Sequence, residues 1–123
     1  MSTIDIIKSQ IAENPIILYM KGTPQFPQCG FSARTVELLT QYDEPFAFVN
    51  ILEHPDIRGE LPKYAQWPTF PQLWVNQELV GGCDIVVELA QRGELESLIK
   101  GARQQSNAST EFTAPNAEPA NTK

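Results

Sequence analysis

The sequence predicts a single α/β domain in which a four-stranded mixed sheet, made of a parallel pair and an antiparallel hairpin, is flanked by helices. Helical and extended patterns alternate over the first half of the chain, which is typical of strands joined through helices. Two later extended segments are separated by only two residues, which predicts an antiparallel hairpin. Apolar residues make up 41% of the 123 residues, enough for one hydrophobic core.

The first half of the chain is expected to form two helices and two strands. Ile4, Ile7 and Ile11 recur at helical spacing, and Pro15 ends that helix because proline cannot continue it. The run Ile16–Met20 is continuously apolar, as in a strand that is buried on both faces. The expected elements are a helix over 3–13, a strand over 16–20, a helix over about 30–42 and a strand over 46–51.

The second half is expected to begin with a weak helix over 55–66. Pro55 is favourable in the first turn, but Pro62 in the helix interior costs about 3 kcal/mol or forces a kink, and Gly59 weakens the helix further. We therefore expect a short or broken helix. The elements that follow are a hairpin of strands 70–75 and 78–80 around the imperfect turn Asn76-Gln77, a helix over about 85–92 capped by Asp84, and a last short helix with Leu95, Leu98 and Ile99.

The composition of the chain changes at about Ala102. Gln, Asn, Ser, Thr, Ala and Pro dominate from there on, and Phe112 is the only large apolar residue. Such a segment cannot bury enough apolar surface to offset the entropy lost on ordering. We therefore expect a folded domain over 1–101 and a disordered tail over 102–123.

The charge and the cysteine content exclude several classes of protein. With 9 Lys and Arg against 15 Asp and Glu the net charge is −6, and no basic run is present, which argues against nucleic acid as a partner. No apolar run approaches the ~20 residues that span a bilayer, and the N-terminus does not resemble a signal peptide. Two cysteines are too few for a disulfide framework and are expected to be reduced. These observations predict a cytoplasmic protein.

The stretch from Lys21 to Ser32 carries the clearest chemical signal. It leaves the first strand, crosses a loop with prolines and places Cys29 at the start of an amphipathic helix. The unpaired N–H groups and dipole of a helix N-terminus favour thiolate, which attacks disulfides and binds soft metals. Ser32 occupies the position of the second cysteine in a Cys-x-x-Cys pair. The sequence therefore predicts chemistry with one thiol.

Four motifs, in this order along the chain, resemble the single-domain bacterial monothiol glutaredoxins of the Cys-Gly-Phe-Ser type. They are Lys21 eight residues before the cysteine, Cys29–Ser32, Trp67–Pro71 and Gly81–Asp84. The resemblance covers about residues 3–101. It implies a thioredoxin-like fold with a cis peptide bond before Pro71, a form that only X-Pro bonds adopt cheaply.

The resemblance also implies a glutathione site beside the cysteine. In this reading Lys21 and Arg58 bind the glycine carboxylate, and the Phe70 backbone pairs with the tripeptide as a short strand. The implied contacts at the other end are the Cys83 and Asp84 backbone N–H groups for the γ-glutamyl carboxylate and the Asp84 side chain for the ammonium.

The chemistry of Cys29 leaves more than one function open. A [2Fe–2S] cluster needs four ligands, so Cys29 from each chain of a homodimer and two bound glutathiones would complete the set. This predicts a cluster carrier for delivery or iron regulation, whose cluster-bearing face recruits BolA-like proteins and apo iron–sulfur proteins. The alternative is a glutathione-dependent thiol–disulfide oxidoreductase in which Cys29 is the catalytic nucleophile. The resemblance suggests weak activity of that kind.

Each residue also has a simpler interpretation. Cys83 can be interpreted as a small residue that suits the packing and contributes only its backbone N–H. The alternative is that it is a redox partner of Cys29. Lys21 and Arg58 are ordinary solvated charges unless the motif context holds. His54 is the sole histidine, and without a second one a metal role is not expected.

Overall fold

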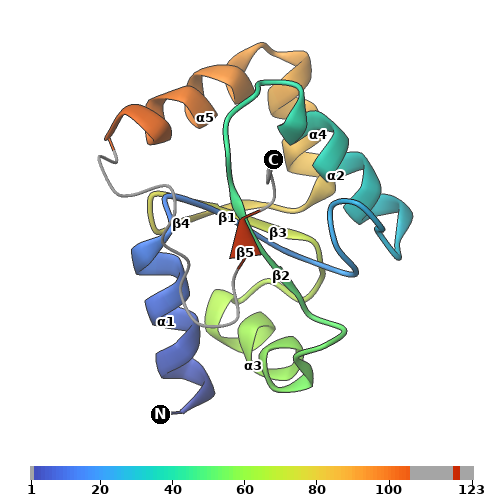
Figure 1. Ribbon diagram of the computed structural model, residues 1–123, viewed down its shortest axis with the longest axis vertical. Helices are drawn as coiled ribbons and strands as arrows, with labels where there is room; N and C mark the ends of the chain where they lie inside the picture. The colour runs from blue at the N-terminus through green and yellow to red at the C-terminus, as the bar shows by residue number, and fades with distance from the viewer. Residues whose placement is uncertain (1, 106–117, 120–123) are drawn as a thin grey trace.

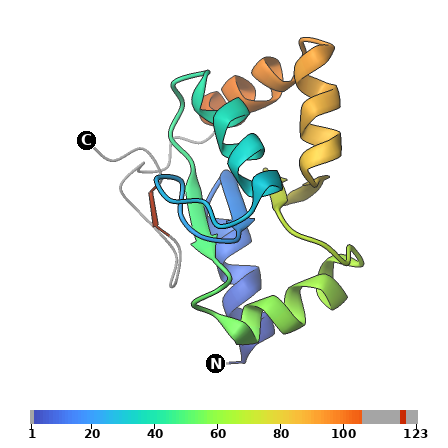
Figure 2. The same cartoon turned by 90° about the vertical axis from the view of Figure 1, so that its right-hand side faces the viewer.

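A mixed sheet separates two layers of helices in the computed structural model, which describes residues 2–105 and 118–119 (Figure 1). The strands, in hydrogen-bonded order, are β4 (Glu78–Gly81), β3 (Gln72–Val75), β1 (Ile16–Met20), β2 (Ala47–Asn50) and β5 (Glu118–Pro119). The helices are α1 (Thr3–Glu13), α2 (Gly30–Thr40), α3 (Pro55–Ala65), α4 (Cys83–Gln91) and α5 (Glu94–Gln105). α1 and α3 cover one face of the sheet, and α2, α4 and α5 cover the other (Figures 1 and 2).

The four predicted strands pair as expected. β1 runs parallel to β2, β3 runs antiparallel to β1, and β4 runs antiparallel to β3. The predicted α/β class with a four-stranded mixed sheet is confirmed. β5, which pairs antiparallel with β2 over two residues, is an addition that the sequence did not predict. Across the described residues, no helix combines the length and apolarity needed to span a membrane.

β1 lies at the centre of the core. Ile16, Leu18 and Met20 pack in the layer of α2, α4 and α5, whereas Ile17 and Tyr19 pack in the layer of α1 and α3. All five side chains are at most 2% exposed, which confirms the predicted burial on both faces. The Tyr19 hydroxyl keeps a hydrogen bond by donating to Gln10 Oε1 (2.8 Å). Because β1 is held from both sides, the position of the chain just beyond Met20 is well determined.

α3 is a continuous helix of 11 residues, so the expectation of a short or broken helix is wrong. Ile57 and Leu61 are fully buried. Burial of such a side chain contributes about 1.5–3 kcal/mol, which for the two together offsets the penalty of Pro62 inside the helix. The helix ends at Gln66, whose left-handed backbone (φ 54°) directs its N–H to the Lys63 carbonyl.

α4 and α5 differ in their bounds from the prediction. Gly82 rather than Asp84 is the N-cap of α4, so Asp84 lies in the first turn. α5 is not short, since it runs for 12 residues. It continues past the expected domain end at residue 101 because Ala102, only 1% exposed, still packs in the core. Apart from this helical end and β5, the predicted disordered tail lies outside the described residues.

The turn between β3 and β4 has two residues in the left-handed region. Asn76 has a φ of 51° and Gln77 a φ of 68°, as a type I′ turn requires. The Asn76 N–H donates to the Pro15 carbonyl (2.8 Å), which ties the turn to the start of β1. Asparagine tolerates this backbone, but a residue such as Gln77 pays roughly 1–2 kcal/mol for it. The predicted imperfection of the turn is therefore a local strain at Gln77.

Gln77→Gly should stabilise the domain by about 1 kcal/mol, because glycine adopts a positive φ without a Cβ clash. Thermal unfolding followed by circular dichroism should show a melting temperature higher by about 4 °C. Gln91→Gly makes the same change at the end of α4, where the backbone is helical, and should not stabilise the protein. An unchanged or lower melting temperature for Gln77→Gly would show that the turn is not strained.

Candidate functional site

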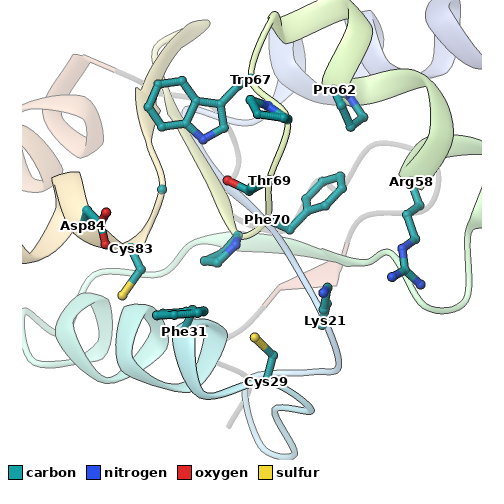
Figure 3. A pocket seen from close by; sticks show the side chains of 13 residues that line it. Lys21, Cys29, Phe31, Arg58, Pro62, Trp67, Thr69, Phe70, Cys83 and Asp84 are labelled. Carbon is teal, nitrogen blue, oxygen red and sulfur yellow. The ribbon is translucent and has the colours of Figure 1, made fainter.

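A cavity of about 560 Å³ opens where the N-termini of α2 and α4 face α3 and the connection from α3 to β3 (Figure 3). This volume is in the range of small-molecule sites. The cavity brings together all six predicted site residues, Lys21, Cys29, Arg58, Phe70, Cys83 and Asp84. The other lining residues are Phe31, Pro62, Trp67, Pro68, Thr69, Pro71 and Gly82.

The two ends of the cavity differ in charge. Lys21 and Arg58 lie at one end and Cys83 and Asp84 at the other, with Cys29 along the side between them (Figure 3). Within the part of the chain that the structure describes, neither basic side chain pairs with a carboxylate. Two unpaired cations at one end and a helix N-terminus at the other suit a ligand with two carboxylates.

The loop between β1 and α2 is a tight structure that delivers Cys29 to the cavity. The Gln28 N–H donates to the Lys21 carbonyl (2.9 Å), which closes the loop on itself. Gly22 has a φ of 95°, and a Cβ added there would lie 2.6 Å from the Phe26 carbonyl oxygen. Only glycine fits at this point, so the loop has one compact path to Cys29.

Cys29 is the N-cap residue of α2, as predicted, and is half-buried. The pKa of its thiol is lowered, chiefly by the nearby backbone N–H of Ser32. Partial burial opposes this effect and raises the pKa, whereas the Phe31 N–H, the Lys21 charge and the Ser32 hydroxyl lower it further. The helix N-terminus therefore does what the sequence predicted and favours the thiolate at Cys29.

Ser32 has a role that its position in the motif did not predict. Its side chain is fully buried, and its hydroxyl oxygen accepts a hydrogen bond from the Lys21 backbone N–H (3.1 Å). The same hydroxyl interacts with the Cys29 sulfur. Ser32 thus joins the end of β1 to the first turn of α2 and to the thiolate. The sequence shows that a second cysteine is missing, but it does not show this contact.

The connection before β3 contains the cis peptide bond that the resemblance implies, between Phe70 and Pro71. A fully buried glutamine, Gln72, holds this connection in place. Its Nε2 donates to the carbonyls of Trp67 (3.0 Å) and Thr69 (3.3 Å), and its Oε1 accepts from the Trp74 indole N–H (3.2 Å). Sequence reasoning missed this residue, although a lone polar residue within an apolar strand is the signal that could have found it.

The start of α4 approaches the cavity closely because two glycines precede it. Gly81 has a φ of 144°, and a Cβ there would lie 2.7 Å from an Ile85 side-chain carbon. A Cβ on Gly82 would lie 3.3 Å from the Pro71 carbonyl and 3.5 Å from the Trp67 indole nitrogen. That indole N–H is buried and has no hydrogen-bond partner among the described residues. The wall beside α4 therefore contains an unused donor as well as the helix N-terminus.

A single chain offers few side chains that could bind a metal ion beside the thiol of Cys29. Among the described residues, no group of three or more His, Cys, Asp or Glu side chains is placed to hold a metal ion. Cys83 lines the far end of the same cavity, close to the start of α4. A chain with this arrangement can bind a small anionic ligand and present one thiolate beside it.

Ser32→Ala should raise the pKa of Cys29, because it removes a hydroxyl that stabilises the thiolate. The measurement is the pH dependence of iodoacetamide alkylation in a Cys83→Ser background, where Cys29 is the only thiol. The midpoint should move to higher pH but stay below that of free cysteine, since the Ser32 backbone N–H remains. Ser9→Ala on α1 is the control. A midpoint that does not move would exclude a role of the hydroxyl in activating the thiol.

Comparisons with known proteins show the family of this chain. A family model described as Glutaredoxin matches residues 16–80, which include Lys21, Cys29, Arg58 and Phe70. Glutaredoxin 4 of Escherichia coli (strain K12) is 68% identical over 99 residues, which cover 80% of this chain and 86% of that protein. Glutaredoxin 4 of Pasteurella multocida (strain Pm70) is 66% identical over 99 residues, covering 80% of this chain and 91% of that protein.

The fold is similar to that of a solved structure. The solution structure of reduced poplar apo GrxS14 superposes with a TM-score of 0.68 at 44% sequence identity, covering 83% of this chain and 91% of that one. The thioredoxin-like fold implied by the motifs is therefore confirmed. With one activated cysteine at the start of α2 and Ser32 where a second would stand, the chain belongs to the glutaredoxin family and is of the monothiol type.

Proposed function

We propose that this protein carries a [2Fe–2S] cluster between two copies of itself, with Cys29 of each copy and the thiols of two bound glutathiones as the four ligands. The observation that carries this proposal is the position of one activated thiol beside a cavity with unpaired cations at one end and a helix N-terminus at the other. The cluster is cargo in this account, acquired from one protein and given to another.

The charges that line the cavity support glutathione as its ligand. The tripeptide has a carboxylate at each end and an ammonium group beside one of them. Lys21 and Arg58 would take the glycine carboxylate, and the N–H groups of Cys83 and Asp84 would take the γ-glutamyl carboxylate. The Asp84 side chain would take the ammonium, and the Phe70 backbone would pair with the tripeptide as a short strand. This arrangement leaves the glutathione thiol on the side of Cys29.

The number of sulfur ligands then explains why two chains are needed. A [2Fe–2S] cluster takes four ligands, normally thiolates. Each chain contributes Cys29, and the hydroxyl of Ser32 is a harder donor that is already bonded to Lys21. In this proposal Cys83 contributes only its backbone N–H, so two chains are two thiolates short, and two glutathiones supply them.

The surface around Cys29 is suited to a second chain. Phe26 is 72% exposed and Phe31 is 62% exposed, and these rings lie in the loop before Cys29 and the first turn of α2. Exposed aromatic rings next to a reactive group are typical of contact surfaces. We propose that this face contacts a second copy, a BolA-like protein or an apo iron–sulfur protein, in the reducing cytoplasm.

The lowered pKa of Cys29 also supports thiol–disulfide exchange as the second candidate function. In this reaction the Cys29 thiolate attacks the glutathione sulfur of a protein–glutathione disulfide and releases the protein thiolate. A second glutathione then attacks the Cys29–glutathione disulfide, which gives glutathione disulfide and regenerates the thiolate. An assay with a glutathionylated peptide measures this activity directly, and turnover by the cluster-free protein would support the oxidoreductase.

Lys21→Ala and Arg58→Ala should each weaken glutathione binding by about 1.5–3 kcal/mol, which is roughly 10- to 150-fold, because each removes a charge-assisted contact. Isothermal titration calorimetry measures this affinity. Lys8→Ala removes one exposed positive charge on α1, away from the cavity, and should leave the affinity unchanged. Equal affinities for the wild type and both cavity variants would show that these cations do not bind the tripeptide.

Cys29→Ser should abolish cluster binding, whereas Cys83→Ser should retain most of it, because position 83 contributes through its backbone N–H. The two variants and the wild type are reconstituted anaerobically with iron, sulfide and glutathione, and visible absorbance reports the cluster. An equal loss in both variants would instead favour a cluster held by four protein cysteines.

A further inference from the structure

Asn50, at the end of β2, holds two backbone segments at once. Its side-chain Oδ1 accepts a hydrogen bond from the Gly22 N–H (2.9 Å) and another from the Leu52 N–H (3.0 Å). An amide oxygen has two lone pairs, so one atom satisfies both donors. Asn50 does not line the cavity itself, and the function proposed above gives it no role.

The first of these segments leads directly to the thiol end of the site. Gly22 follows Lys21, whose own N–H is bonded to Ser32 in the first turn of α2. The loop after Gly22 is closely packed, since a Cβ on Gly22 would lie 2.6 Å from the Phe26 carbonyl oxygen. The bond from Gly22 to Asn50 therefore helps to hold the backbone next to Lys21, together with the hydrogen bonds of Lys21 itself to Ser32 and Gln28.

The second segment leads to the other cation. After Leu52 the chain makes a hydrogen-bonded turn, in which the His54 N–H donates to the Ile51 carbonyl (3.2 Å). The His54 carbonyl then accepts from the Arg58 N–H (3.0 Å) in the first turn of α3. The path from Asn50 to Arg58 is thus a short and continuous series of backbone hydrogen bonds.

We propose that Asn50 is a positioning residue that fixes the separation of Lys21 and Arg58, and so the affinity of the carboxylate end of the cavity. This proposal rests on the glutathione site proposed above. Lys21 comes before β2 in the sequence and Arg58 comes after it. Their like charges repel each other, so the backbone has to hold them at a fixed separation. A single side-chain atom, Asn50 Oδ1, hydrogen-bonds to both segments.

The chemistry of the two bonds selects the variants. Asn50→Asp keeps an oxygen acceptor of the same size and shape, so both N–H groups stay bonded. Asn50→Leu keeps the size and removes the acceptor. Ile99→Val is the matched control, because it loosens the core on α5, in the layer away from α3.

The first readout is amide hydrogen exchange by NMR, which needs no ligand. In Asn50→Leu the Gly22 and Leu52 amides should both exchange at least about 10-fold faster than in the wild type, since each loses a hydrogen bond. In Asn50→Asp and Ile99→Val both rates should stay within about 3-fold of the wild-type rates. Unchanged exchange at either amide in Asn50→Leu would overturn the proposal.

The second readout is the glutathione dissociation constant by calorimetry. Asn50→Leu should raise it about 10-fold, and Asn50→Asp should restore it to within about 3-fold of the wild type. In a Lys21→Ala, Arg58→Ala background Asn50→Leu should change it less than about 2-fold, because there are no cations left to position. A full effect in that background, or wild-type affinity in Asn50→Leu, would overturn the positioning role.

The two proposals fail in different ways. A wild-type protein that does not bind glutathione overturns the proposed function and the positioning role together, whatever the exchange rates are. A wild-type protein that binds glutathione, with an Asn50→Leu variant that binds it equally well, overturns the positioning role alone.

Discussion

The hydrogen bond from the Lys21 backbone N–H to the Ser32 hydroxyl (3.1 Å) joins the end of the central strand to the first turn of α2. Its donor is anchored by β1, which is buried on both faces, and its acceptor is fully buried inside the helix. Because both ends are held by the core, Cys29 at the N-terminus of α2 is held as well. This link keeps Lys21 next to the first turn of α2, whose Ser32 and Phe31 backbone N–H groups are the main groups that lower the pKa of Cys29.

The opposite wall of the cavity depends on a separate set of contacts. Gln72 is buried and bonds the backbone on both sides of the connection that contains the cis Phe70–Pro71 bond. Gly82 lets the start of α4 come close to this connection, within reach of the Trp67 indole. The cavity is therefore formed between rigid backbone segments, so its charged side chains meet a ligand without a large rearrangement of the chain.

The sequence predicts the sheet and the cysteine well because both depend on local patterns. The apolar run Ile16–Met20 and the helical spacing of apolar residues in α1 indicate burial directly. The amphipathic pattern that follows the proline-containing loop indicates that Cys29 lies at the start of a helix. The break expected at Pro62 was wrong because burial of Ile57 and Leu61 outweighs a local propensity. Burial also accompanies the length of α5, which runs past residue 101 with Ala102 packed in the core.

The supporting residues of the site are harder to predict. Ser32 hydrogen-bonds to the end of β1, and Gln72 hydrogen-bonds to the connection that precedes β3. No local sequence pattern predicts such contacts. The residues expected to bind the ligand were predicted from sequence motifs, which identify the residues but not the contacts that each of them makes. The structure adds that Lys21 and Arg58 have no carboxylate partner within its described residues, which is the feature that makes them available to a ligand.

In the proposed mechanism glutathione completes the ligand set of a cluster shared by two chains. The decisive measurement is size-exclusion chromatography with visible absorbance, run after anaerobic reconstitution with glutathione, with a simple monothiol or with no thiol. We expect a coloured dimer with glutathione and a colourless monomer without thiol. The simple monothiol should give little coloured dimer, because it lacks both carboxylate contacts. A coloured dimer of equal yield in the thiol-free sample would show that glutathione is not a ligand of the cluster.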